Sequence, residues 1–168
     1  MPQIKIREWN EKPRTKLRFI KIGDIFCYQF SEEMFVFGQI LGKVNVGHVI
    51  QFFDFFQASP TITVEELSRA QFIGKPIIVD SYTLFDRNPV WSWQIIGHQV
   101  DFDPSPFKDL AFKWGDPNGL HFGKVWLDGR REPKIFSREE VEDLDWEACV
   151  GSIVYNRILE EKLEKQMK

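Results

Sequence analysis

Between Gly23 and Phe56 the apolar residues fall into three short runs, separated by polar or glycine-containing breaks. Within each run apolar side chains occupy both alternating faces, which is typical of β-strands covered on both sides. The break at Ser31–Glu33 is short enough for a tight hairpin turn, and the break at 42–47 is looser. We therefore predict three sequential antiparallel strands, at Ile25–Phe30, Met34–Leu41 and Val49–Phe56.

Helical spacing replaces this pattern after the third strand. Thr63 and Glu66 form a capping-box sequence, which predicts a short helix within 59–71. The stretch Asp101–Gly119 is rich in proline and glycine around Phe107 and Trp114, so we expect an irregular surface loop with aromatic plugs. Further strands are predicted at Ile77–Tyr82, Val90–Ile96 and His121–Leu127.

Two more helices are predicted towards the C-terminus. Ser137 and Glu140 form a second capping box, followed by apolar residues at helical spacing up to Ala148. Ser152–Lys168 carries one apolar face, to which Tyr155, Leu159, Leu163 and Met167 contribute.

These elements predict an α+β, predominantly β fold. Its antiparallel sheet is strongly bent or barrel-like, with a short helix after the third strand and one or two C-terminal helices within 137–168. Residues 1–16 form a basic arm or an edge segment, because charged and apolar residues alternate there. At 168 residues the chain fits one domain, 1–168, with its own core.

Composition supports a folded interior and sets the expected compartment. Sixteen Phe and six Trp favour a sheet-dominated core, and the net charge of −3 gives no general nucleic-acid signature. Two cysteines, Cys27 and Cys149, provide no disulfide framework, and the charged N-terminus lacks the apolar run of a signal peptide. We expect a cytoplasmic protein that does not enter a membrane.

Candidate chemistry is sparse in this sequence. His48, His98 and His121 are far apart and show no metal-ligand spacing, although the fold could still bring them together. Cys27 lies between Phe26 and Tyr28 and is interpreted as a small core residue. With no glycine-rich phosphate loop or nucleophile motif either, we expect no catalytic residues, no metal and no cofactor.

The most distinctive polar feature is a run of six carboxylates within nine positions, 139–147. It is either the solvated face of a helix or an acidic docking surface for a basic partner. For the second interpretation we select Glu139, Glu142 and Asp143 as partner-binding residues. Asp101 and Asp103, with aromatic neighbours Phe102 and Phe107, would extend that surface.

Several of these motifs resemble the immunity protein 26 family of bacterial polymorphic toxin systems. The motifs are GDIFCYQF and EEMFVFGQIL, then HVIQFFDFF with Asp54, and finally Trp93 to Gly97, so that the resemblance spans roughly Leu17 to Phe107. It implies a mainly β cytoplasmic antitoxin that neutralises the toxin domain encoded beside it, as in contact-dependent inhibition. Many such toxins are nucleases with basic clefts, so the expected partner is the C-terminal domain of a cognate toxin, a nuclease. No functional residue carries over from the family.

Three functions therefore compete. The leading hypothesis is a non-enzymatic immunity protein that acts by stoichiometric binding, with no direct contact to nucleic acid or membrane. The second is a metal-dependent, phosphotriesterase-like hydrolase that uses His48, His98 or His121 with nearby acids. The third is a nucleic-acid-binding module that uses the basic N-terminal segment.

Overall fold

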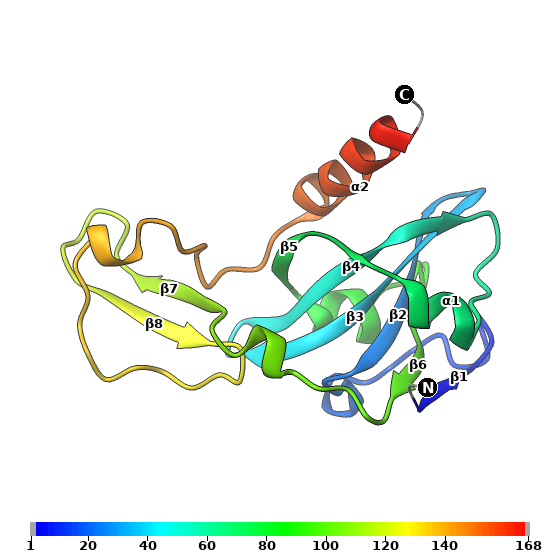
Figure 1. Cartoon of the computed structure of the whole chain (residues 1–168), viewed down its shortest axis with the longest axis horizontal. Helices are drawn as coiled ribbons and strands as arrows, with labels where there is room; N and C mark the ends of the chain where they lie inside the picture. Colours follow the sequence, from blue (N-terminus) through cyan, green and yellow to red (C-terminus); the bar gives the residue numbers. More distant parts are fainter. Residues whose placement is uncertain (1–2, 167–168) are drawn as a thin grey trace.

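A computed structural model describes residues 3–166 of the chain. Its main part is a six-stranded sheet of order β1-β6-β2-β3-β4-β5, in which all neighbouring strands are antiparallel (Figure 1). The edge strands β1 and β5 do not pair with each other, so the sheet is bent and open rather than closed into a barrel. The strands are β1 (Ile4–Ile6), β2 (Asp24–Ser31), β3 (Met34–Val44), β4 (Gly47–Gln57), β5 (Phe72–Val79) and β6 (Trp93–Gln99).

The three-strand meander predicted from the apolar runs is confirmed as β2, β3 and β4. Glu32 and Glu33 form the tight turn between β2 and β3. Register shifts interrupt the pairing of β4 with both of its neighbours, and such irregularities increase the twist and bend of a sheet. The predominantly antiparallel, bent α+β architecture follows from these strands.

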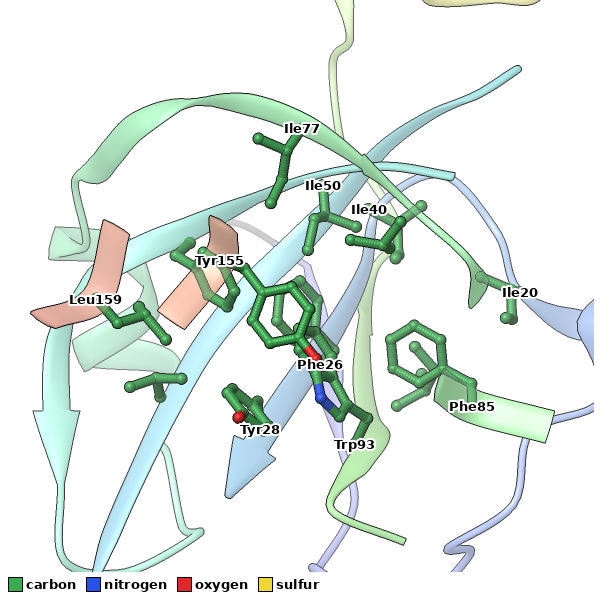
Figure 2. Packing of buried hydrophobic residues seen from close by; sticks show 14 of the residues in the cluster. Ile20, Phe26, Tyr28, Ile40, Ile50, Ile77, Phe85, Trp93, Tyr155 and Leu159 are labelled. Carbon is green, nitrogen blue, oxygen red and sulfur yellow. The ribbon is translucent and has the colours of Figure 1, made fainter. Parts of the chain in front are cut away.

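The principal core lies on one face of this meander. Figure 2 shows Trp93 of β6 among Phe26, Tyr28 and Tyr155, with ring-centroid separations of 5.2, 4.4 and 5.2 Å respectively. Tyr155 and Leu159 come from helix α2 (Ser152–Gln166) and close this face of the sheet. Within residues 3–166, no helix is long and apolar enough to cross a lipid bilayer.

The opposite face of the meander is covered by helix α1 (Val64–Arg69). Leu67 of α1 packs in a cluster with Cys27, Phe37 and Phe53. The predicted capping box is confirmed, because Glu66 N–H donates to Thr63 Oγ1 and Thr63 N–H donates to the Glu66 carboxylate. Burial on both faces explains why β2 and β3 are apolar at successive positions.

The N-terminal segment, predicted to be a basic arm or an edge segment, contains an edge strand. β1 pairs with β6 at the border of the sheet, and Met1 and Pro2 of the 1–16 segment lie outside the described residues. The segment also covers Gln94 of β6, whose side-chain amide donates to Asn10 Oδ1 over 2.8 Å. β6 is therefore buried on both faces from Trp93 to Gly97.

A second sheet consists of the hairpin β7 (Ala111–Gly115) and β8 (Phe122–Trp126), which extends away from the main sheet (Figure 1). β8 confirms the predicted strand at His121–Leu127, but β7 corrects the prediction of an irregular loop over Asp101–Gly119. The base of the hairpin packs Phe112 and Val125 against Leu41 of β3. The strand is only five residues long and lies between proline-containing segments, which favoured the interpretation as a loop.

The bounds of two strands also differ from the predictions. β5 runs from Phe72 to Val79, because Asp80 accepts hydrogen bonds from Thr83 and starts the π-helical turn η2 (Tyr82–Asp86). β6 begins at Trp93 rather than Val90, after Trp91 takes up a positive φ of 51°. The last predicted helix is confirmed as α2, while Met167 and Lys168 lie outside the described residues.

The short helix predicted from Ser137 to Ala148 does not form. Only the 3-10 turn η4 (Glu139–Val141) follows the second capping box. Beyond this turn, Lys113 N–H donates to Asp145 O and Glu147 N–H donates to Lys113 O, both over 2.8 Å. Residues 142–144 form a turn and bend, and a β-bridge between Trp146 and Lys113 follows. The hydrogen bonds to β7 take the place of helical hydrogen bonds.

Candidate partner-binding surface

The outer end of the hairpin has a small core of its own. Phe122, Phe136 and Val141 are buried together, and Phe122 and Phe136 exchange two backbone hydrogen bonds of 3.1 and 2.9 Å. This packing fixes the turn η4 beside β7 and β8 at the end farthest from the main sheet (Figure 1). The acidic run therefore lies on a projecting part of the molecule.

Half of the six carboxylates in this run are neutralised within the chain. The strongest pair joins Glu147 to Arg131 through contacts of 2.7 and 3.0 Å, and the Glu147 side chain is only 4% exposed. Two further pairs, Glu140 with Lys134 and Asp145 with Lys75, are solvent-exposed. These three acids have structural partners, so their charge is not available to a second protein.

Glu139, Glu142 and Asp143 differ from their neighbours in being exposed and unpaired. None of them makes a salt bridge within residues 3–166. The pKa of Glu139 lies below its ordinary value, because its carboxylate accepts hydrogen bonds from its own backbone N–H and from Ser137. The three selected residues thus present negative charge to solvent at the end of the hairpin.

Two tryptophans flank this acidic turn. Trp114 of β7 and Trp146 are 40% and 38% exposed, unusually high fractions for such large rings. The Arg131 guanidinium lies 4.9 Å from the Trp114 ring centroid, and Lys113 Nζ lies 5.2 Å from that of Trp146. These cations fix the rings in place and leave apolar area exposed beside the carboxylates, an arrangement suited to a protein interface.

The exposure of Trp114 and Trp146 was not predicted from the sequence. Trp114 was assigned to a loop as an aromatic plug, whereas β7 turns it outward. The alternation of Phe112, Lys113 and Trp114 is the signal that could have indicated a strand. Trp146 offered no such signal, because its exposure depends on the pairing of its segment with β7.

Asp101 and Asp103 lie in the connection between β6 and β7, apart from the turn η4 (Figure 1). Asp101 Oδ1 accepts a hydrogen bond from Gln3 N–H over 2.9 Å. Asp103 accepts from both the hydroxyl and the backbone N–H of Ser105, and these bonds lower its pKa. Both carboxylates therefore order their own loop, and they do not continue the acidic surface of the hairpin.

The histidines occupy three separate environments. His48 is buried in β4, with Nδ1 2.9 Å from Ser81 Oγ, and burial lowers its pKa to about 4. His98 Nδ1 lies 2.8 Å from Asp24 Oδ1, and His121 is exposed. Within residues 3–166, no three His, Cys, Asp or Glu residues gather as metal ligands would.

The cysteines are unsuited to nucleophilic chemistry. Cys27 is fully buried, and burial raises the pKa of its thiol. Cys149 is more accessible, but burial and the Asp80 charge raise its thiol pKa as well, and its Sγ donates to Val46 O over 3.0 Å. A raised pKa keeps a thiol protonated and poorly reactive.

A comparison with protein families identifies this chain. The model of immunity protein 26 matches residues 21–121, more than half of the sequence. The chain belongs to the immunity protein 26 family. No curated protein and no solved structure matches it.

The family assignment confirms the resemblance and indicates a toxin-neutralising role with a toxin protein as partner. The match runs from Lys21 to His121 and so contains β2 to β7. It ends before β8 and the turn η4. The meander thus belongs to the matched segment of this immunity protein 26 member, whereas α2, which completes its core, and the unpaired acids Glu139, Glu142 and Asp143 lie outside it.

Proposed function

We propose that this immunity protein neutralises its cognate toxin by forming a stoichiometric complex, without catalytic turnover. The observation that carries this proposal is the family match over residues 21–121. The partner is the toxin's C-terminal domain, which we take to be a nuclease encoded beside this protein and met in the cytoplasm. Binding would protect the producing cell by covering the toxin's active site or a surface next to it.

We place the centre of the contact at the outer end of the hairpin. There Glu139, Glu142 and Asp143 are exposed and unpaired among the described residues, and Trp114 and Trp146 present apolar area beside them. A nuclease binds a polyanion and needs a basic cleft, to which this surface is complementary in charge. Carboxylates would steer the encounter, and the tryptophans would supply buried contact area.

Asp101 and Asp103 remain part of the proposal as a separate, secondary contact. Both residues are exposed, although each carboxylate already accepts a hydrogen bond, Asp101 from Gln3 N–H and Asp103 from Ser105. A toxin large enough to cover the hairpin would have to extend along the β6–β7 connection to reach them.

The test is co-expression with the product of the adjacent toxin gene. We expect the two proteins to co-purify as a complex of defined stoichiometry, in which toxin activity is blocked. The control is an immunity protein of another toxin, which should neither bind nor protect. A toxin that stays active in the presence of excess protein, without forming a complex, would refute the proposal.

A further inference from the structure

A cavity of about 320 Å³ lies between the N-terminal segment and strands β2 and β6. Its cationic wall consists of Arg7, Lys12 and Lys21, and Phe19 and Ile95 line it with apolar surface. The volume falls at the lower end of the range for small-molecule sites. This cavity is distinct from the acidic hairpin and plays no part in the proposed toxin contact.

The charges on its wall are not balanced. Arg7, Lys12 and Lys21 make no salt bridge within residues 3–166. The wall has one carboxylate, Asp24, whose two oxygens are already engaged by Lys21 N–H at 2.7 Å and by His98 Nδ1 at 2.8 Å. Three cations facing one engaged carboxylate leave the cavity with excess positive charge.

The wall is fixed by backbone hydrogen bonds to the sheet and the turn η2. Arg7 N–H donates to Ile96 O over 2.7 Å, and Thr15 N–H donates to Phe85 O over 2.9 Å. Next to Thr15, the N–H of Leu17 donates to the carboxylate of Asp86. Because these contacts are made by the chain's own backbone and by Asp86, they organise the wall in advance, which lowers the entropy cost of binding.

Two polar groups of the wall have unused hydrogen-bonding capacity. Thr15 is 4% exposed, and its Oγ1 is buried with no hydrogen-bond partner within residues 3–166. Such a group normally finds a partner, so an orphaned hydroxyl at a cavity wall points to a missing one. His98 uses Nδ1 towards Asp24, and its Nε2 makes no hydrogen bond among the same residues.

We propose that this cavity binds a phosphate group. A phosphate carries close to two negative charges near pH 7 and offers several acceptor oxygens in different directions. It therefore suits donors from separate segments, namely Arg7 after β1, Lys12, Lys21 and the Thr15 hydroxyl. The phosphate is either free inorganic phosphate or a monoester, whose organic part would contact Phe19 and Ile95.

Calorimetric titration of the full chain with sodium phosphate, against sodium chloride at matched ionic strength, tests the site. We expect one saturable site for phosphate and none for chloride. Lys12→Ala/Lys21→Ala should weaken phosphate binding about tenfold or more, since two charge-assisted contacts are lost. Lys5→Ala/Lys16→Ala removes the same charge from exposed lysines outside the cavity and should change the affinity less than about twofold.

A second titration with phenyl phosphate separates the two sources. Tighter binding than inorganic phosphate assigns the site to a monoester, and equal or weaker binding assigns it to free phosphate. The proposal is overturned if the wild type shows no saturable phosphate binding. It is also overturned if both double variants weaken binding equally, or if a single-stranded oligonucleotide binds with equal loss in both, because the interaction would then be general charge attraction.

Thr15→Val provides a readout that does not depend on net charge. Valine has nearly the same shape but no hydroxyl, so the variant should fold and lose affinity for phosphate several-fold if Oγ1 contacts the ligand. Thermal unfolding without phosphate checks that the variant is folded. An unchanged phosphate affinity in a folded Thr15→Val protein would remove Thr15 from the site and contradict the role given to its hydroxyl.

Discussion

The six-stranded sheet and the outer end of the hairpin use tryptophan in opposite ways. Trp93 is 1% exposed and packs against other aromatic rings, whereas Trp114 is 40% exposed and lies against the backbone of Gly123 in β8 and the Arg131 guanidinium. Charge is divided in the same way: the cluster around Trp93 consists of aliphatic and aromatic residues, and the acidic run beside the hairpin has three ion pairs next to three carboxylates without a salt bridge among residues 3–166. The molecule separates the part that stabilises its fold from the part that can meet a partner.

Truncating one tryptophan in each region tests most directly whether the sheet and the hairpin contribute differently to stability. Trp93→Ala should lower the free energy of unfolding by about 3–5 kcal/mol, because it opens a cavity among Phe26, Tyr28 and Tyr155. Trp114→Ala is the matched control and should cost only about 1 kcal/mol or less. Urea denaturation monitored by circular dichroism measures both. Equal losses would mean that the hairpin is as important to stability as the sheet.

Lowering the pH should destabilise the folded protein through His48, which is buried in the sheet. Burial, followed by the Lys43 charge, lowers the pKa of His48 from 6.5 to about 4, so the folded protein keeps the imidazole neutral. The unfolded chain takes up this proton first as the pH falls, and folding therefore loses about 3 kcal/mol between pH 6.5 and 4. Above pH 6.5 this contribution is fully present.

His48→Gln should abolish that pH dependence. The difference in unfolding free energy between wild type and His48→Gln, followed from pH 7 to 4, isolates the histidine from other titrating groups such as Asp24. Burial raises the pKa of Asp24, which acts in the opposite direction. A difference that stays constant over this range would show that His48 is protonated equally in both states.

Among the ion pairs of the acidic run, the buried one should contribute more to the unfolding free energy than the exposed ones. Glu147→Gln removes a carboxylate that is 4% exposed and bonded to Arg131 through both oxygens, and should cost about 1.5 kcal/mol of unfolding free energy. The control Asp145→Asn breaks the exposed pair with Lys75 and should cost less than about 0.5 kcal/mol. Chemical denaturation compares them, and a reversed order would contradict the role given to burial.

Replacing the unpaired carboxylates should have the smallest effect on the unfolding free energy, but it should clearly slow toxin binding. Replacing Glu139, Glu142 and Asp143 together by Lys should change the unfolding free energy by no more than about 0.5 kcal/mol. Association with a basic toxin should slow about tenfold or more at low salt, because steering is lost. Surface plasmon resonance at two salt concentrations measures the rate.

The matched control for this charge reversal lies on α2. Glu160, Glu161 and Glu164 are exposed there, and replacing them by Lys changes the net charge by the same amount. If the control slows association as much as the hairpin triple, the toxin responds to total charge, and the contact is not centred on η4.

Several features were predictable from sequence because their causes are local. The three apolar runs predicted β2, β3 and β4, and the Thr63–Glu66 capping box predicted α1. The acidic run was also visible, but its three unpaired members could not be separated from Glu140, Asp145 and Glu147. That distinction depends on partners from distant segments, such as Arg131 and Lys75.

The antiparallel meander, the N-cap of α1 and the apolar character of the core follow from the amino-acid sequence alone, because periodicity and turn chemistry act over a few neighbouring residues. Tertiary structure decided the rest. Hydrogen bonds from the segment of Asp145 and Glu147 to β7 took the place of helical ones, so residues 142–144 form a turn where the local pattern indicated a helix, and Trp114 and Trp146 face outward. Folding also brought Arg7, Lys21 and His98 to one cavity, a proximity that depends on the pairing of β1 and β2 with β6.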